Sequence, residues 1–502
     1  MSSQYKRLKV SSRPYVPLSM PTKSPPVCFL PEDNPLAAGL SVEAQAVLRN
    51  LDEKKQFVLV QGLAGSGKSV LIAAIVRFLQ AVLPELKVVV VCPTAMAAVN
   101  LHSHGVLSAG TLHSRFSLRC SPPRTDAHKP WVQDRAGETD LLILDEISMV
   151  DGEIFELVSD AFAIQDKQRN FPFGTRVRVL MVGDFLQIPP ISGKFVFSTD
   201  CWPSADRLAS LRLRTNYRQQ EDLPFFRSLC AIRTGDYTHV NRELFAARVG
   251  LVPPDDVTRL FAFKNDVERY NAKRLDELKT EFEPGSVAKV GEFKQATRFP
   301  VSDKDIMLAR AKTENATDLE KLIPVDHTLR IKVGAVVMVR KNGVVPGEVN
   351  GSTGTVVAVE RTAGGTAMQF VSVQFAKGVV HRIARHIFDV PFGRTLIVEI
   401  AQFPFIVAFA TSIHKAQGST MQRAVVDPKV FGSGMLYVAL SRVVSLQGLF
   451  LTSALPRTWP LHKPATLKME EDKSVLFLCA ALVEFRDQID VRQAVKMIAE
   501  FF

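Results

Sequence analysis

The residues best suited to chemistry in this sequence form one short loop. Glycines, a lysine and a hydroxyl recur at the spacing G-x-x-x-x-G-K-[ST], in which backbone N–H groups surround a β-phosphate and the following helix adds its N-terminal dipole. The apolar run 57–61 predicts a strand before the loop, and 69–83 predicts a helix after it. This context predicts binding and hydrolysis of a nucleoside triphosphate, with Lys68 on the β- and γ-phosphates and Ser69 on Mg²⁺. The loop consists of Gly62, Leu63, Ala64, Gly65, Ser66, Gly67, Lys68 and Ser69.

Two further apolar runs are predicted strands that are followed by polar side chains at their carboxyl ends. The run 141–144 ends in Asp145 and Glu146, and the run 177–182 leads to Gln187. Open α/β sheets bind ligands at the carboxyl ends of their strands. We therefore expect Asp145 to hold Mg²⁺, Glu146 to act as general base on the attacking water, and Gln187 to respond to the γ-phosphate.

Apolar runs of strand length alternate with helical stretches over the first half of the chain. The segment 87–92 is predicted as a further strand, and 40–48 as a helix that Ser41 caps. Nearly unbroken apolar strands are typical of parallel sheets covered on both faces, so this part is predicted to be α/β. The segment 330–390 differs, because its short strands and the turn pairs Asn350-Gly351 and Gly364-Gly365 indicate a small β insertion. The α/β pattern is expected to resume at 406–410, and the proline- and charge-containing segment 116–139 is expected to be a surface excursion.

Composition narrows the choice of partners. The chain has 502 residues, and no apolar run approaches the length of about 18 residues that a membrane-spanning helix requires. The net charge of +11 suits a partner made of phosphates. The six cysteines are scattered without a C-x-x-C pair, which argues against a structural zinc site or a disulfide framework and favours reduced thiols.

The first residues suggest two cellular addresses. Residues 1–31 contain no Asp or Glu, and such acid-poor, Ser-containing leaders resemble mitochondrial presequences. The run 6–9 (KRLK) instead fits a minimal nuclear signal. Prolines from Pro14 onward would stop an amphipathic helix early. The nucleus is favoured, with the mitochondrion as the alternative.

Motifs in a fixed order connect these residues to a known family. The segments 145–151, 170–174 and 183–190 read DEISMVD, NFPFG and GDFLQIPP. Together with the phosphate-binding loop they resemble superfamily 1 helicases, and specifically the Pif family of 5′-to-3′ DNA helicases, over residues 36–455. The segment 155–174 is similar to the signature that separates this family from its bacterial relatives.

The resemblance implies an ATP-dependent 5′-to-3′ DNA helicase that translocates on single-stranded DNA and unwinds duplex or structured DNA in repair, recombination and replication. Its partners would be single-stranded and forked DNA, with RNA–DNA hybrids and G-quadruplexes as further substrates, and it would be a monomer without a membrane partner. The excursion 116–139 stands at the place of the strand-splitting wedge and is short. Ala416 and Ser419 also depart from the residues that relatives carry. The alternative is therefore an ATP-driven translocase that removes bound proteins with little strand separation.

The resemblance also assigns roles by position within the motifs. Gln45 would read the adenine edge, Tyr217 would stack on adenine, and Arg218 and Arg442 would stabilise charge on the transferred phosphoryl group. The implied catalytic set is Lys68, Asp145, Glu146, Gln187, Arg218 and Arg442. Nucleotide contacts outside the loop are Gln45, Tyr217, Gln417 and Gly418, and DNA contacts are Thr94, Thr111, His113, Thr411, His414, Lys415 and Tyr437.

The implied fold is α/β, with two RecA-like parallel-sheet lobes of the P-loop NTPase type and an SH3-like, β-rich insertion in the second lobe. The expected parts are a disordered basic Pro-rich arm at 1–35, a first lobe at 36–205, a second lobe at 206–300 and 395–455, the insertion at 301–394, and a helical tail at 456–502.

Overall fold

The computed structural model describes residue 29, residues 35–461 with short gaps, and residues 476–478. The gaps are 53–54, 119–121, 192, 256, 296–302, 315–322, 324, 342, 347, 349–351, 376–377 and 393–395. The expectations for the basic arm and its targeting signal lie outside the described residues. Contacts divide the chain into a larger unit, within 28–115, 121–277 and from 408 onward, and a smaller unit, which includes 116–120 and 278–407.

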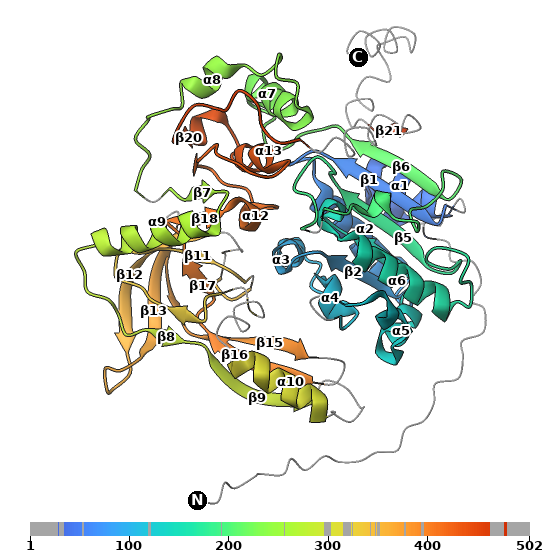
Figure 1. The fold of residues 1–502 in the computed structure, drawn as a ribbon, viewed down its shortest axis with the longest axis horizontal. Helices are drawn as coiled ribbons and strands as arrows, with labels where there is room; N and C mark the ends of the chain where they lie inside the picture. Colours follow the sequence, from blue (N-terminus) through green and yellow to red (C-terminus); the bar gives the residue numbers. More distant parts are fainter. Residues whose placement is uncertain are drawn as a thin grey trace, which may run out of the picture. The chain divides into compact units, whose positions relative to one another are not determined.

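A seven-stranded sheet organises the first part of the larger unit, with the strand order β21-β6-β1-β5-β4-β2-β3 (Figure 1). Every pairing in this sheet is parallel, as the unbroken apolar runs predicted. Its strands are β1 (Phe57–Gly62), β2 (Val88–Cys92), β3 (Gly110–Thr111), β4 (Leu141–Leu144), β5 (Arg178–Gly183), β6 (Leu208–Leu213) and β21 (Leu476–Leu478).

Strand β21 corrects the expectation of a helical C-terminal tail. Leu476–Leu478 pair in parallel with Leu211–Leu213 at the edge of the sheet. The short Leu-Phe-Leu run can add to an open sheet edge, whose N–H and C=O groups would otherwise lack partners. The rest of the expected tail beyond residue 461 lies outside the described residues.

Helices cover both faces of this sheet, because successive side chains of each strand point to opposite faces. Val58 and Val60 of β1 belong to the core that α1 and α2 complete. Phe57 points to the other face, where its ring lies 5.6 Å from that of Phe173, which also contacts Phe155 of α6. The helices are α1 (Val42–Asp52), α2 (Lys68–Val82), α3 (Ala95–Ser103), α4 (Leu112–Arg115), α5 (Pro130–Gly137) and α6 (Gly152–Gln165), with 3₁₀ turns η1 (Pro35–Gly39), η2 (Arg124–His128), η3 (Ile147–Met149) and η4 (Val196–Ser198).

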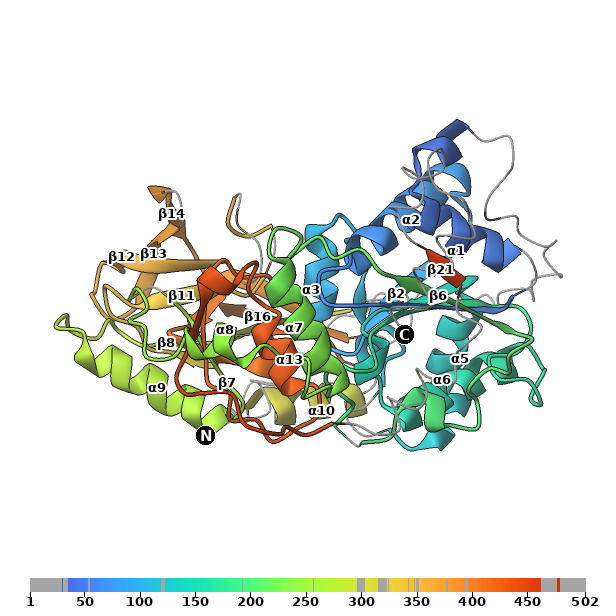
Figure 2. The same cartoon turned by 90° about the horizontal axis from the view of Figure 1, so that it is seen from above.

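A second parallel sheet, β18-β7-β19-β20, lies in the same unit. Leu260 of β7 shares a buried core with Phe225 of α7 and Leu436 of α13, and these two helices lie side by side in both views (Figures 1 and 2). The elements are β7 (Arg259–Phe261), β18 (Ala410–Ser412), β19 (Ala424–Val426), β20 (Leu449–Leu451), α7 (Leu223–Thr234), α8 (Arg242–Ala246), α9 (Lys264–Glu277), α12 (Ile413–Ala416), α13 (Met435–Leu440) and η6 (Leu446–Gly448). Two parallel sheets with their helices confirm the predicted α/β class.

The smaller unit is antiparallel. Its sheets have the orders β14-β13-β12-β11-β17, β15-β16-β9 and β10-β8. The turn at Gly364-Gly365 joins β12 to β13, as the sequence predicted, whereas Asn350-Gly351 lies outside the described residues. The elements are β8 (Ser286–Val287), β9 (Lys289–Gln295), α10 (Asp303–Glu314), β10 (Thr328–Leu329), β11 (Val336–Val339), β12 (Thr353–Arg361), β13 (Met368–Phe375), β14 (Val380–Ile383), β15 (His386–Phe392), β16 (Leu396–Gln402) and β17 (Phe405–Val407).

Two local expectations were wrong. The run 406–410 was expected to resume the α/β pattern, but Ile406 pairs with Met338 in the antiparallel sheet and only Ala410 begins the parallel strand β18. An apolar run alone does not show which of two sheets it joins. The excursion 116–139 was expected to lie on the surface, but η2 and α5 pack against α6 and bury Val132. Among the described residues, no helix is both long enough and apolar enough to cross a membrane.

Candidate nucleotide-binding site

The loop between β1 and α2 adopts the conformation that its glycines permit. Gly65 and Gly67 have φ values of +80° and +83°, which side chains other than glycine rarely tolerate. The Lys68 ammonium donates hydrogen bonds to the carbonyl oxygens of Gly62, at 2.8 Å, and Leu63, at 2.9 Å. These bonds fold the side chain back across the loop, so the structure places Lys68 where a phosphate held by the loop amides would meet it.

A cavity of about 640 Å³ opens in front of this loop. That volume lies in the range of small-molecule sites, roughly 300–1,000 Å³. The cavity brings together residues far apart in the sequence, from the first sheet and from the segments around the second. The predicted site residues that line it are Ala64, Gly65, Ser66, Gly67, Lys68, Ser69, Glu146, Gln187, Tyr217, Arg218, Gly418 and Arg442.

Three cations face this cavity, Lys68 and Arg442 buried and Arg218 partly buried, and desolvation disfavours the charge of each. Burial lowers the pKa of Lys68 and of Arg442. Burial, and then the charge of Arg442, lower the pKa of Arg218 to about 9. Arg218 Nη1 donates to the Ser441 carbonyl oxygen at 2.7 Å, which fixes it near Arg442. A polyanion in the cavity would offset this mutual repulsion, so the donor set fits a triphosphate.

The two acids after β4 are held differently. Asp145 is buried, and its Oδ1 accepts the Glu146 amide at 2.9 Å. Burial, and then the neighbouring charge of Glu146, raise the pKa of Asp145 to about 7. Glu146 has φ +49°, and its Oε2 accepts a hydrogen bond from Gln417 Nε2 at 3.2 Å. A divalent cation would favour the ionised form of Asp145, so this carboxylate and the Ser69 hydroxyl are oxygen donors of the kind that fit a Mg²⁺ that phosphates hold in part.

An ion pair behind Gln187 was missed by the sequence reasoning. Asp184 is fully buried and accepts three hydrogen bonds of 2.6–3.2 Å from Arg233 of α7. Gln187 Nε2 donates to the same carboxylate at 3.2 Å. Burial raises the pKa of Asp184, but the charge and hydrogen bonds of Arg233 outweigh it, so this pKa ends below its ordinary value. On the other side of Gln187, a Cβ added at Gly434 would lie 2.4 Å from the Gln187 carbonyl oxygen.

Two residues differ from expectation around the cavity. The Gln45 amide nitrogen donates to the carbonyl oxygens of Ala37 and Leu40, at 3.1 and 3.2 Å, and Gln45 does not line the cavity. Asn100, to which no nucleotide role was assigned, does line it and donates to the Ser69 hydroxyl at 3.0 Å. Asn100 lies in a helix after a different strand, so no local spacing could have linked it to the loop.

The expected DNA contacts fall into two groups. Thr94, Thr111, His113, His414 and Lys415 are partly or fully exposed at the ends of strands and short helices. Thr411 and Tyr437 are 2% and 4% exposed. The Tyr437 hydroxyl accepts the Ala64 amide at 3.0 Å. The structure therefore places Tyr437 against the phosphate-binding loop, where it has almost no surface to offer a DNA strand.

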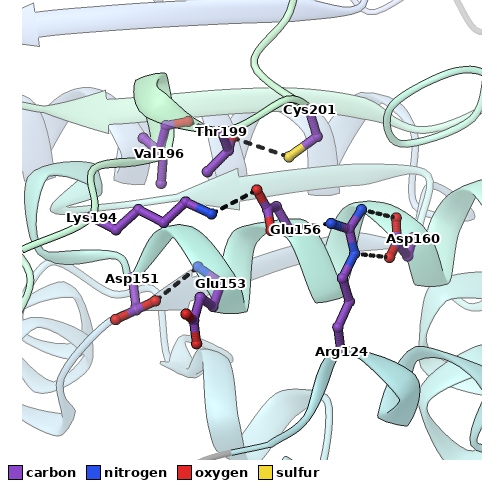
Figure 3. Close-up of polar contacts among 9 residues, drawn as sticks. All are labelled: Arg124, Asp151, Glu153, Glu156, Asp160, Lys194, Val196, Thr199 and Cys201. Carbon is purple, nitrogen blue, oxygen red and sulfur yellow. Dashed lines mark hydrogen bonds and ion pairs between the residues drawn. The ribbon is translucent and has the colours of Figure 1, made fainter. Parts of the chain in front are cut away.

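A cluster of ion pairs connects η2, in the segment 116–139, to helix α6 (Figure 3). Arg124 of η2 contacts Glu156 at 3.2 Å and also pairs with Asp160, both on α6. The other oxygen of Glu156 contacts Lys194 at 2.9 Å. Glu156 is only 7% exposed, and a cation on each of its oxygens compensates its charge. This cluster holds η2 onto α6 and α6 onto the segment that follows β5.

Comparisons with known proteins place this geometry in one family. The model of the PIF1-like helicase family matches residues 39–242. The ATP-dependent DNA helicase PIF1 of Homo sapiens is 33% identical over 82% of this chain, which spans 60% of that protein. The crystal structure of Pif1 helicase from Candida albicans has a TM-score of 0.67 at 26% identity, over 86% of this chain and 99% of that chain. A crystal structure of Pif1 helicase from Bacteroides in complex with ADP-AlF3 and ssDNA has a TM-score of 0.59 at 25% identity, over 87% of this chain and 97% of that chain. The chain, with its phosphate-binding loop and ordered motifs, belongs to the PIF1-like helicase family.

Proposed function

We propose that this protein is an ATP-dependent 5′-to-3′ DNA helicase that moves along single-stranded DNA and unwinds duplex or structured DNA. One observation carries the proposal: a single cavity is lined by the phosphate-binding loop, by Glu146 and by the arginines Arg218 and Arg442. Such a set can bind a triphosphate, orient a water and stabilise the charge that develops on the transferred phosphoryl group.

Each side chain has a role in that step. Lys68 would bind the β- and γ-phosphates, and Ser69 and Asp145 would hold Mg²⁺, which neutralises phosphate charge when bound. Glu146 would take the proton of the attacking water, and its hydrogen bond from Gln417 would keep the carboxylate oriented. The remaining roles in the set are a γ-phosphate contact for Gln187, transition-state stabilisation for Arg218 and Arg442, stacking on adenine for Tyr217, and backbone contacts for Gly418.

Motion would follow from the way the cavity is built. The loop belongs to the first sheet, whereas Arg442 follows α13 in the core of the second sheet. Nucleotide would draw the two sheets together and hydrolysis would release them. The partly or fully exposed threonine, histidine and lysine side chains near the strand ends would hold DNA phosphates without reading sequence. The Bacteroides relative crystallised with both a nucleotide analogue and ssDNA supports this assignment.

The test is an unwinding assay with a matched variant. Lys68→Ala is expected to abolish DNA-stimulated phosphate release and unwinding, because it removes the buried cation of the loop. Lys87→Ala, at an exposed lysine outside the cavity, is the control. Wild-type protein should open 5′-tailed and forked duplexes but not 3′-tailed ones. Opening of 3′-tailed duplexes alone would refute the polarity, and DNA-stimulated hydrolysis with negligible unwinding would select the translocase alternative.

We also propose that the activity serves genome maintenance in the nucleus. The family relationship and the net charge of +11 support it. Imaging the protein with and without residues 1–31 tests the address, since loss of nuclear signal is expected without them. Mitochondrial signal from the full chain would contradict it.

A further inference from the structure

Three aromatic rings meet on the second sheet outside all the motifs that supplied the catalytic set. Phe263 and Phe431 have ring centroids 4.8 Å apart, and His414 lies 6.4 Å from Phe431 with its ring within 28° of parallel. We call these three residues the aromatic platform. Of the three, only His414 was expected to contact DNA.

The topology explains why these rings meet. Strands β18, β7 and β19 are neighbours in one parallel sheet. His414 lies in the short helix after β18, Phe263 lies two residues after the end of β7, and Phe431 lies in the loop after β19. Three consecutive carboxyl ends therefore each contribute one ring. This is the edge of an open α/β sheet at which ligands bind.

The two phenylalanines of the platform are open to solvent although they are apolar. Phe263 is 48% exposed and Phe431 is 55% exposed. Packing against each other covers only part of each ring, so one face or edge of the pair remains available. Exposed large aromatic side chains that gather in one place are typical of binding surfaces, whereas single exposed apolar residues are ordinary.

Lysines that neighbour the platform residues in the sequence supply the charge that a phosphate backbone would meet. An exposed lysine accompanies each ring in the sequence: Lys264 beside Phe263, Lys415 beside His414, and Lys429 two residues before Phe431. Glu268 pairs with Lys264 at 3.2 Å, but that contact lies between exposed side chains and contributes little. Rings interleaved with cations are the combination that binds single strands, because bases stack on the rings while phosphates meet the charges.

We infer that the aromatic platform is a base-stacking site for single-stranded DNA, on which a nucleobase of the tracking strand stacks against Phe263 and Phe431. This inference rests on the proposed function and extends the DNA path beyond His414. Stacking accepts any base, because every base has a π-face. The site therefore gives the second sheet a contact with the bases that phosphate-binding residues alone do not provide.

The experiment separates stacking from charge. Binding of the nucleotide-free full chain to a labelled thymidine oligonucleotide is measured by fluorescence anisotropy, and again with a strand in which abasic sites replace the bases. Phe263→Ala combined with Phe431→Ala is expected to weaken binding of the normal strand about tenfold, near the lower end of what stacked bases contribute. Wild-type protein should prefer the normal strand over the abasic one, and the double variant should lose that preference.

Three controls keep the outcome specific. Phe171→Ala removes another exposed phenylalanine of the same unit, 46% exposed, and should bind as wild type. Phe431→Trp should retain binding, whereas Phe431→Leu should not, although leucine preserves apolar packing. The slope of log affinity against log salt should stay unchanged in the phenylalanine variants, because their phosphate contacts are intact.

The two proposals fail in different ways. If wild-type protein binds the normal strand and prefers it over the abasic strand, but the double variant keeps that preference, the platform is refuted and the helicase proposal stands. If wild-type protein does not discriminate against abasic sites, the platform is also refuted. If wild-type protein binds no DNA strand and DNA does not stimulate hydrolysis, both proposals are wrong. Phosphate release without DNA should be equal in all variants, because neither phenylalanine lines the nucleotide cavity.

Discussion

The buried pair between Asp184 and Arg233 joins the end of β5 to a helix of the second core, and its removal should be costly. Arg233→Met deletes the cation and leaves a fully buried carboxylate that, among the described residues, keeps hydrogen bonds from Gln187 and the Leu186 amide. Breaking a buried pair from one side typically costs about 3–5 kcal/mol. The structure supports the upper part of that range, because Arg233 supplies three of the hydrogen bonds and is itself only 9% exposed at the side chain.

The loss of unfolding free energy in Arg233→Met should depend on pH, because Asp184 titrates. In wild-type protein the pKa of Asp184 is below its ordinary value, so the pair stabilises the fold above the unfolded pKa and loses this effect as the pH falls through the folded pKa. In Arg233→Met the folded pKa rises instead, and the carboxyl protonates. Keeping it protonated at pH 7 costs at most roughly 1.4 kcal/mol for each of about 3 pH units above the unfolded pKa, or about 4 kcal/mol. The destabilisation should therefore be larger at pH 7 than near pH 4.5, because the cost of protonating the buried carboxyl shrinks as the pH falls, whereas the contribution of the pair is lost at both values.

A urea titration followed by tryptophan fluorescence measures the free energy of unfolding of the larger unit, which contains the Asp184–Arg233 pair. All three tryptophans, Trp131, Trp202 and Trp459, lie in that unit. Asp184→Asn should be destabilised by a similar amount at both pH values, because neither asparagine nor arginine titrates there. Combining Asp184→Asn with Arg233→Met should recover most of the loss, since no charge then stays buried. A cost for Arg233→Met below about 1 kcal/mol, or one that does not change with pH, would refute the reasoning.

The matched control lies on the same helix. Arg227 of α7 is exposed, and Arg227→Met should change the free energy of unfolding by no more than about 0.5 kcal/mol at either pH. If the control loses as much as Arg233→Met, the effect belongs to the helix and not to the buried pair.

Three further predictions use the same site. Gly434→Ala should cost at least about 2 kcal/mol and lower kcat for ATP, because φ is +72° and the added Cβ would lie 2.4 Å from the Gln187 carbonyl oxygen; urea titration and phosphate release measure both, and an unchanged kcat would contradict the link to Gln187. Tyr437→Phe should cost about 1–2 kcal/mol by leaving the loop amide at Ala64 without its acceptor, and a value near zero in the same titration would show that the amide finds another partner. Arg124→Ala should cost at most about 1 kcal/mol, because Arg124 is half exposed and Lys194 still pairs with the buried carboxylate; a larger loss would mean that the contact between η2 and α6 depends mainly on this ion pair.

Much of the fold followed from local pattern. The strand Leu141–Leu144 was predicted at its observed bounds, and β1, β2 and β5 within about a residue, because unbroken apolar runs of strand length ending in polar residues are typical of buried parallel strands. The loop between β1 and α2 was also predictable from local sequence, because its glycines, lysine and hydroxyl lie within one contiguous segment. Local sequence did not predict which strands pair with one another in a sheet. The run 406–410 divides between two sheets, and Leu476–Leu478 joins a sheet whose other strands end at residue 213.

The site shows the same limit. Lys68, Glu146, Arg218 and Arg442 were named from motifs, and the structure brings them to one cavity. Arg233 was missed because its partner Asp184 lies 49 residues away, and Arg233 itself stands outside the motif that contains Asp184. Side chains that act through tertiary contacts leave no spacing in the sequence.

These missed contacts share a property that bears on how a nucleotide could move the two sheets. The Asp184–Arg233 pair and the Tyr437 hydroxyl on the Ala64 amide both connect elements beside the first sheet to elements of the second core, and both are buried. Arg442, in contrast, donates only to carbonyl and hydroxyl oxygens of its own lobe among the described residues, so a phosphate could attract it without breaking a connection between the sheets. If the Asp184–Arg233 pair and the Tyr437–Ala64 hydrogen bond persist while the arginines respond to the nucleotide, the two sheets would move relative to each other by rotation about these contacts. The carboxyl ends of the second sheet, which carry the aromatic platform, would then sweep along a strand instead of separating from it.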